Sequence, residues 1–174
     1  MKSFSSRCLA CLLPLAAVLS STAVAEAQVA QVSSQHKVLE AEVGTWDAQV
    51  SMFIPGVAEP MTSKGVEVNE SFGDGLWLIS RFEMEIGGQE FIGRGQFGYD
   101  PVKKKYVGTW IDIMTPHLAT LEGDYDASTK TMTMMMHSTG PDGQPMVAKS
   151  VSKMNEDGTR TYTCLLYTSD AADE

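Results

Sequence analysis

The chain has 174 residues and a formal net charge of −9, with 22 acidic against 13 basic side chains. This acidic balance lacks the basic patch that binds phosphates, so we expect no nucleic-acid partner. The length of the part that follows the N-terminal segment suits one domain with one core, and no linker or low-complexity block marks a second domain.

The first 25 residues have the pattern of an export signal. Lys2 and Arg7 give a positive start, Cys8–Ser20 is an apolar run too short for a stable anchor, and Ala23-Val24-Ala25 ends it in small residues. We therefore predict an exported protein, periplasmic or secreted, with no membrane span after the signal is cleaved.

The last residues, Cys164–Glu174, can be encoded by a transposase-type sequencing adapter read through in frame. We therefore expect the native domain in this sequence to cover residues 26–163, with its closing strand missing. The alternative is a solvated acidic tail. Two of the three cysteines lie in the signal and the third in this tail, so we expect no disulfide, thiolate nucleophile or cysteine metal site.

A short helix is expected first, capped by Ser34, with Val38, Leu39 and Val43 as a loose apolar face before Gly44 ends it. Beyond this point apolar residues recur with period two, which predicts strands. The predicted strands are Thr45–Phe53, Thr62–Phe72, Leu76–Ile86, Gln89–Tyr99, Tyr106–Ile113, Ala119–Tyr125, Thr131–Ser138, Met146–Met154 and a last one from Thr159 onward.

The connections carry residues that favour tight turns, as at Pro55-Gly56, Gly73-Asp74-Gly75, Gly87-Gly88 and Pro141-Asp142-Gly143. They are too closely spaced for crossover helices, which excludes a parallel α/β fold. A short helix followed by about nine or ten antiparallel strands favours a closed up-and-down barrel, because closure removes exposed strand edges. A chain without its closing strand would expose such an edge.

Gly44-x-Trp46, which follows the short helix and opens the first strand, is similar to the lipocalin opening signature. Further motifs are His36…Leu39…Gly44-x-Trp46, Gly75-Leu76-Trp77, Gly98-Tyr99-Asp100-Pro101 and Gly108-Thr109-Trp110-Ile111-Asp112…Met114…Pro116-His117-Leu118…Glu122-Gly123. Over roughly His36–Thr163, these motifs resemble the bacterial domain-of-unknown-function family 1579. The resemblance implies a lipocalin-like, calycin-type β-barrel in small exported or cytoplasmic bacterial proteins, with no established activity.

The function favoured by this fold is binding of a small apolar or amphipathic molecule in the barrel lumen, because such lumens are concave and apolar with few polar groups. The methionine-rich strand around Met134 and several aromatic residues would supply the walls. Arg81 or Arg94 would orient a polar end such as a carboxylate. The predicted apolar wall residues are Trp77, Phe91, Phe97, Trp110 and Met134. No cofactor and no metal are expected.

Two alternatives remain open. His117, in a loop at the rim, with Asp112 and Glu122 on the flanking strands could form an enzyme site or hold haem or a metal at the barrel mouth. A barrel with a filled core would instead be a ligand-free structural or interaction module. No nucleophile–base pair is legible, so binding is preferred to catalysis. The sequence indicates no particular oligomeric state.

Overall fold

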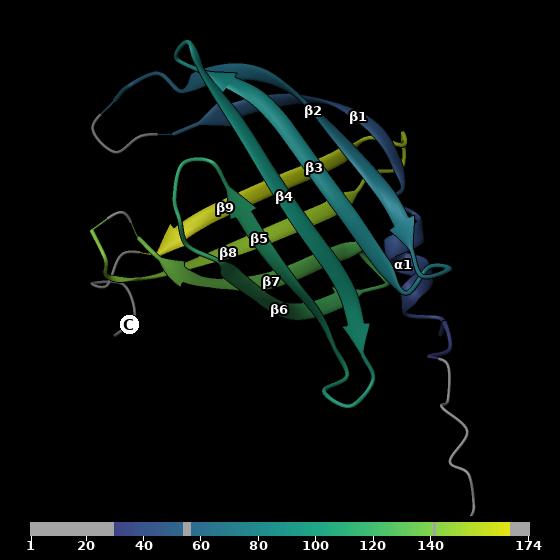
Figure 1. Cartoon of the computed structure of the whole chain (residues 1–174). Helices are drawn as coiled ribbons and strands as arrows, with labels where there is room; N and C mark the ends of the chain where they lie inside the picture. Colours follow the sequence, from purple (N-terminus) through teal and green to yellow (C-terminus); the bar gives the residue numbers. More distant parts are fainter. Residues whose placement is uncertain (1–29, 54–56, 141, 168–174) are drawn as a thin grey trace, which may run out of the picture.

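Nine antiparallel strands follow one another in the sheet in chain order, preceded by one short helix, in the computed structural model (Figure 1). The structure describes residues 30–53, 57–140 and 142–167. The predicted export signal, the turn at Pro55-Gly56, Pro141 and the end of the tail lie outside these ranges. The elements are α1 (His36–Glu40), β1 (Gly44–Met52), β2 (Met61–Phe72), β3 (Trp77–Ile86), β4 (Gln89–Asp100), β5 (Lys105–Asp112), β6 (Ala119–Asp126), β7 (Thr131–Thr139), β8 (Pro145–Met154) and β9 (Arg160–Tyr167).

The predicted all-β, antiparallel, up-and-down architecture is confirmed, and every strand boundary that the structure gives lies within one residue of the expected one. The helix is a single turn, and Ser34 does not cap it. Instead the backbone N–H of Ser33 donates to Nδ1 of the buried His36 at 3.0 Å. Val43 is exposed, so the apolar face of the helix is narrower than expected.

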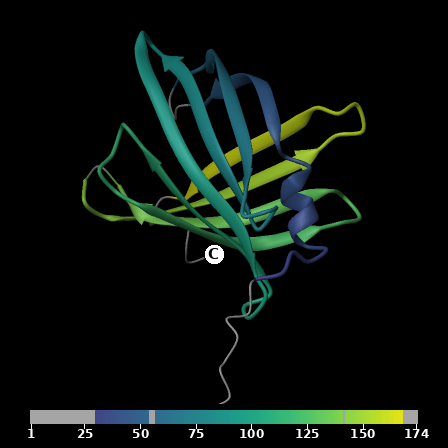
Figure 2. The same ribbon diagram turned by 45° about the vertical axis from the view of Figure 1, so that its right-hand side comes forward.

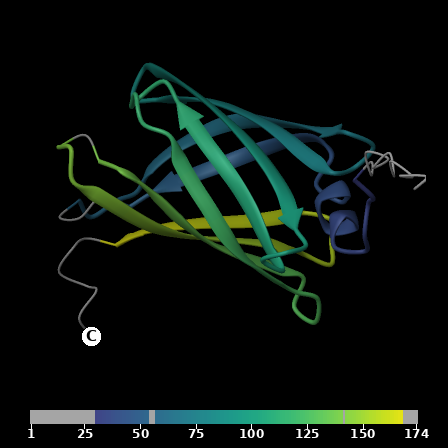
Figure 3. The same cartoon turned by 60° about the horizontal axis from the view of Figure 1, so that its bottom comes forward.

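The sheet curls into a half-barrel. Strands β1–β4 form one wall and β6–β9 cross opposite them, with β5 between (Figures 1 and 2). Helix α1 lies at one end of the curl, where it packs against β3 and β4 (Figure 3). Each strand therefore has one side toward the hollow of the curl and one side toward solvent.

No backbone pairing joins β1 to β9 among the described residues, so the expected ring is not closed by hydrogen bonds there. Nine strands that alternate in direction leave β1 and β9 running the same way, so an antiparallel ladder between them is impossible. The two edges are instead connected by side chains, as described below.

The strand registers define two faces. The concave face comprises the strand positions that share the side of Trp46 through successive cross-strand pairs, and the outer face comprises the alternate positions. On the concave face lie Trp46, Ala48, Val50, Met52, Ser63, Gly65, Glu67, Asn69, Leu78, Ser80, Phe82, Met84, Phe91, Gly93, Gly95, Phe97, Tyr99, Tyr106, Gly108, Trp110, Asp112, Ala119, Leu121, Gly123, Tyr125, Met132, Met134, Met136, Met146, Ala148, Ser150, Ser152, Arg160, Tyr162, Cys164 and Leu166.

The buried core sits at the end of the concave face that α1 covers. Its buried members are Leu39 of α1 with Leu78, Tyr106, Leu121 and Met134. The Tyr106 hydroxyl donates to the backbone carbonyl that precedes α1 at 3.0 Å. This hydrogen bond and the apolar contacts hold the single helical turn on the sheet, because an isolated turn would not be stable by itself.

Glycines on the concave face lie beneath aromatic rings from neighbouring strands. A Cβ on Gly95 would meet the Phe97 ring at 2.7 Å and the Trp110 ring at 2.9 Å, and one on Gly108 would meet Phe97 at 2.5 Å. The ring of Trp110 also covers Gly93. The predicted reasons for glycine in this strand, bending or close approach of another group, therefore include a close approach by aromatic side chains.

Gly123 has the tightest backbone environment, because a Cβ there would lie 2.6 Å from the Cα of Met134 and even closer to the Thr133 carbonyl. We expect Gly123→Ala to lower the free energy of unfolding by about 2 kcal/mol or more. Urea denaturation measures this change. Thr120→Ala, an exposed site on the same strand, should lose much less, and equal losses would contradict this account of β6–β7 packing.

Burial raises the pKa of Tyr106 to about 12 from an ordinary value of 10, and Tyr99 and Tyr125 nearby add to the rise. The folded state therefore retains the phenol proton more strongly than the unfolded state does. The associated stability is present below pH 10 and is lost as pH rises toward about 12. We expect Tyr106→Phe to reduce this alkaline loss in denaturation measured across that range, and an unchanged pH profile would contradict the assignment.

Candidate functional site

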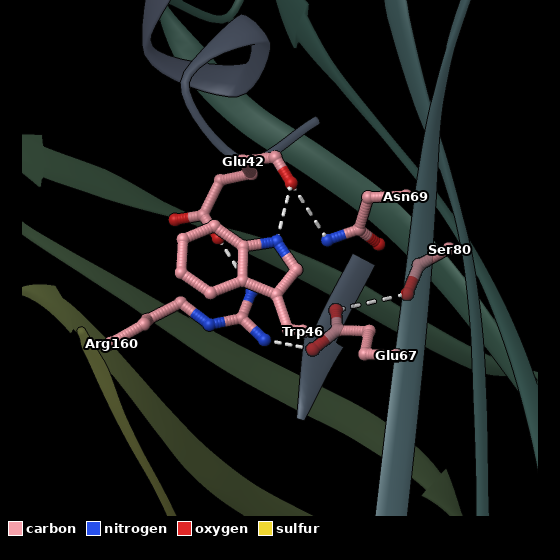
Figure 4. A network of polar contacts seen from close by, with 6 residues as sticks. All are labelled: Glu42, Trp46, Glu67, Asn69, Ser80 and Arg160. Atoms are coloured by element: carbon pink, nitrogen blue, oxygen red, sulfur yellow. Dashed lines mark hydrogen bonds and ion pairs between the residues drawn. The ribbon is translucent and has the colours of Figure 1, made fainter. Parts of the chain in front are cut away.

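An ion-pair network crosses the open side of the curl. Arg160, at the start of β9, pairs its guanidinium with Glu42, between α1 and β1, at 2.5 Å and with Glu67 of β2 (Figure 4). The three side chains are 15%, 19% and 16% exposed. Ser80 donates to the other carboxylate oxygen of Glu67 at 3.1 Å. Both edges of the sheet are therefore connected through one guanidinium.

Trp46 and Asn69 support this network from the same end. The Trp46 indole N–H and the Asn69 amide both donate to the Glu42 carbonyl, at 2.9 and 3.0 Å (Figure 4). The Arg160 guanidinium carbon lies 5.2 Å from the centre of the Trp46 ring, in cation–π range. Trp46 therefore has a structural role at the end of the curl.

Sequence reasoning missed Arg160. Its partner Glu42 is 118 residues away, so no local spacing relates the two. The alternation on β2 gave no usable signal, because the apolar residues Val66 and Val68 are the exposed ones, at 40% and 37%, and the polar Glu67 and Asn69 face inward. Only the structure shows that these polar groups are on the inner side, where buried polar groups need partners.

Four of the predicted wall residues, Phe91, Phe97, Trp110 and Met134, lie on the concave face. Met134 is buried in the core, and Phe97 and Trp110 pack against that core. Phe91 lies toward the other end, where its ring meets the Phe82 ring edge-on at a centroid distance of 6.3 Å. These four residues thus share one surface.

The other three predicted ligand residues, Trp77, Arg81 and Arg94, were expected to face the lumen. The structure places all three on the outer face instead. Trp77 is 40% exposed while its neighbour Leu78 is buried, because successive strand residues point to opposite sides. Arg81 and Arg94 are cross-strand partners there, and Arg81 pairs with Glu83. Neither arginine is positioned to orient a ligand on the concave face.

The structure does not bring His117, Asp112 and Glu122 together. Asp112 accepts hydrogen bonds from the backbone of the loop after β5 and from the Trp110 indole at 3.2 Å. Glu122 is on the outer face and pairs with Lys103 at 2.7 Å. Its cross-strand partner is five residues before Asp112, about 16 Å along β5. A shared acid–base or metal site is therefore not formed by these three residues.

Within the described ranges, no three His, Cys, Asp or Glu side chains gather closely enough to hold a metal ion. The same ranges contain no helix of the length and apolarity needed to cross a bilayer.

The half of the concave face away from α1 is apolar but incompletely buried. Phe82, Met84 and Phe91 are only half-buried there, and none belongs to the core cluster beside the helix. Val50 and Met52 of β1, which β2 separates from β3, are further apolar side chains on the concave face and are also half-buried. We call these five residues the open apolar half.

Two hollows on the molecule are lined mainly by the outer face. One, of about 720 Å³, lies over β1–β3 between charged residues that include Asp47, Lys64 and Glu83. The other, of about 380 Å³, lies beside the exposed rings of Phe72 and Trp77. Met84 of the open apolar half also lines the larger hollow.

We expect Arg160→Ala to lower the free energy of unfolding by about 3 kcal/mol, because it leaves two largely buried carboxylates unpaired beside each other. Lys105→Ala is the matched control, since it removes an exposed ion pair with Asp124 that contributes at most about 1 kcal/mol. Chemical denaturation of both variants tests this. Similar losses for both would show that the network does not stabilise the open side of the curl.

Comparison with curated proteins finds no match. Comparison with protein families matches residues 31–174 to the family described as "Protein of unknown function (DUF1579)". This match covers nearly all of the described residues and includes the segments around Trp46 and Trp110, whose motifs led to the same family. The chain therefore belongs to the DUF1579 family of proteins of unknown function.

Proposed function

We propose that this protein is exported and binds a small apolar or amphipathic molecule on the concave face of its curled sheet. The observation that carries the proposal is the open apolar half, in which Phe82, Met84 and Phe91 remain half-buried. Apolar side chains on a concave surface favour removal from water, at about 25 cal/mol per Å² of area covered. An apolar guest would cover them.

The two ends of the concave face have different roles in the proposed binding. The end under α1 is packed, with Leu39, Leu78 and Leu121 buried, and it gives the sheet a rigid base. The open apolar half lies on the same strands, so its side chains are positioned by that base. Methionine and phenylalanine adapt to varied apolar shapes, which suits a binding surface more than a site for one defined reaction.

Catalysis is less well supported by the same geometry. The constellation that the sequence suggested for acid–base chemistry, His117 with Asp112 and Glu122, is divided between the rim loop, the concave face and the outer face. General acid–base chemistry needs such groups within about one hydrogen bond of a common substrate atom.

Export is supported by the charge and apolarity pattern of the first 25 residues.

The proposal is tested first with the full chain purified without detergent from its native exported fraction. Native mass spectrometry should detect an additional mass that is lost on denaturation. Binding of the neutral apolar fluorophore N-phenyl-1-naphthylamine to the purified protein, followed by its fluorescence rise, gives an independent measurement. A bare polypeptide mass together with no fluorophore binding would favour a structural or interaction module.

Phe91→Ala should weaken binding of that fluorophore by about tenfold, since it removes one half-buried ring from the open apolar half. Ile92→Ala is the matched control, because Ile92 is the next residue on β4 and points to the outer face. Fluorescence titration compares the two variants. Equal weakening by both, or weakening by the control alone, would place the binding surface elsewhere.

A further inference from the structure

The charge on the concave face is unevenly distributed relative to the rest of the molecule. In the strands that the structure describes, Glu67, Asp112 and Arg160 are the charged side chains at concave positions. The lysines of the strands and the two arginines Arg81 and Arg94 lie on the outer face. Arg160 is thus the single cation at a described concave strand position.

Arg160 is not free to receive an anion. Both of its terminal nitrogens pair with carboxylates, one from Glu42 and one from Glu67, and its guanidinium lies against the Trp46 ring. The pair of carboxylates already exceeds its charge by one. Asp112 adds another negative charge at the far end of β5, where its Oδ1 accepts from two loop N–H groups and its Oδ2 accepts from the Trp110 indole N–H. The concave face therefore carries a net negative charge and has no unpaired cation at its described strand positions.

The aromatic side chains on the concave face also disfavour an anionic ligand. Trp110, Phe82, Phe91 and Phe97 lie on the concave face. The face of an aromatic ring is negative, so it attracts a cation placed over it and repels an anion placed there. A carboxylate or sulfate placed there would lose its hydration without gaining a cationic partner, which is the costly case for a buried charge.

We infer that the concave face selects amphipathic ligands whose polar end is neutral or cationic, such as an alcohol or an amine, and rejects anionic ones such as fatty acids. This inference rests on the proposed function, because it concerns the charge of a ligand bound at that same face. It reverses the expectation that an arginine would receive a carboxylate end, because Arg81 and Arg94 are on the outer face and Arg160 is already neutralised.

A matched set of probes tests the inference on the purified full chain. Diphenylhexatriene and its trimethylammonium and propionic acid derivatives share one apolar fluorophore and differ in the charge of one end. All three become fluorescent on leaving water, so titration gives three comparable dissociation constants. We expect the neutral and cationic probes to bind and the carboxylate probe to bind at least about tenfold more weakly.

The outcomes separate this inference from the proposed function. Equal binding of all three probes, or preference for the carboxylate, overturns the charge selection and leaves the proposed function standing. Binding of none of them overturns the proposed function and this inference with it.

A charge variant locates the selecting group. Glu67→Gln leaves Arg160 paired with one carboxylate only, so the carboxylate probe should recover by about fivefold relative to the cationic probe. Glu85→Gln removes the same charge from an exposed outer position on β3 and should leave the ratio unchanged. A ratio that shifts equally in both variants would attribute the selection to overall charge instead, and overturn its assignment to the concave face.

Discussion

The ion pairs of Arg160 are the constraint on which the open side of this fold depends. Backbone hydrogen bonds connect every consecutive pair of strands but do not connect β1 to β9 among the described residues. The guanidinium reaches from β9 to Glu42, which precedes β1, and to Glu67 of β2. Because these groups are largely buried, loss of one partner leaves an unpaired charge, which is costly. The curl is therefore held at its helical end by side chains where a continuous ladder is absent.

The charge selection that we infer for the concave face rests on this same network. Two carboxylates surround the cation at that end, so the interaction that holds the edges together also removes the positive charge that an anionic ligand would need. Arg160 thus links the stability of the open side of the curl to the ligand charge selection that we infer. Elsewhere on the concave face, aromatic rings lie over Gly93, Gly95 and Gly108. The glycines let those rings approach the sheet closely and help to shape the hollow.

Much of the fold was predictable because it depends on local signals. Alternation of apolar residues and turn residues such as Gly73 and Gly87 define where each strand begins and ends, and these positions agree with the structure within one residue. The candidate site was only partly predictable. Phe91, Phe97 and Trp110 share the concave face as expected, whereas Trp77 and its companions in the predicted site do not.

The amino-acid sequence by itself determined the strand class, the meander and the family, because periodicity, turn chemistry and motifs are properties of neighbouring residues. Only the tertiary structure decided which side of each strand is concave. Both sides of β3 carry apolar residues, and a period of two does not say which side is inside. The pairing of Arg160 with Glu42 likewise depends on the curl of the whole sheet, since it joins residues 118 positions apart.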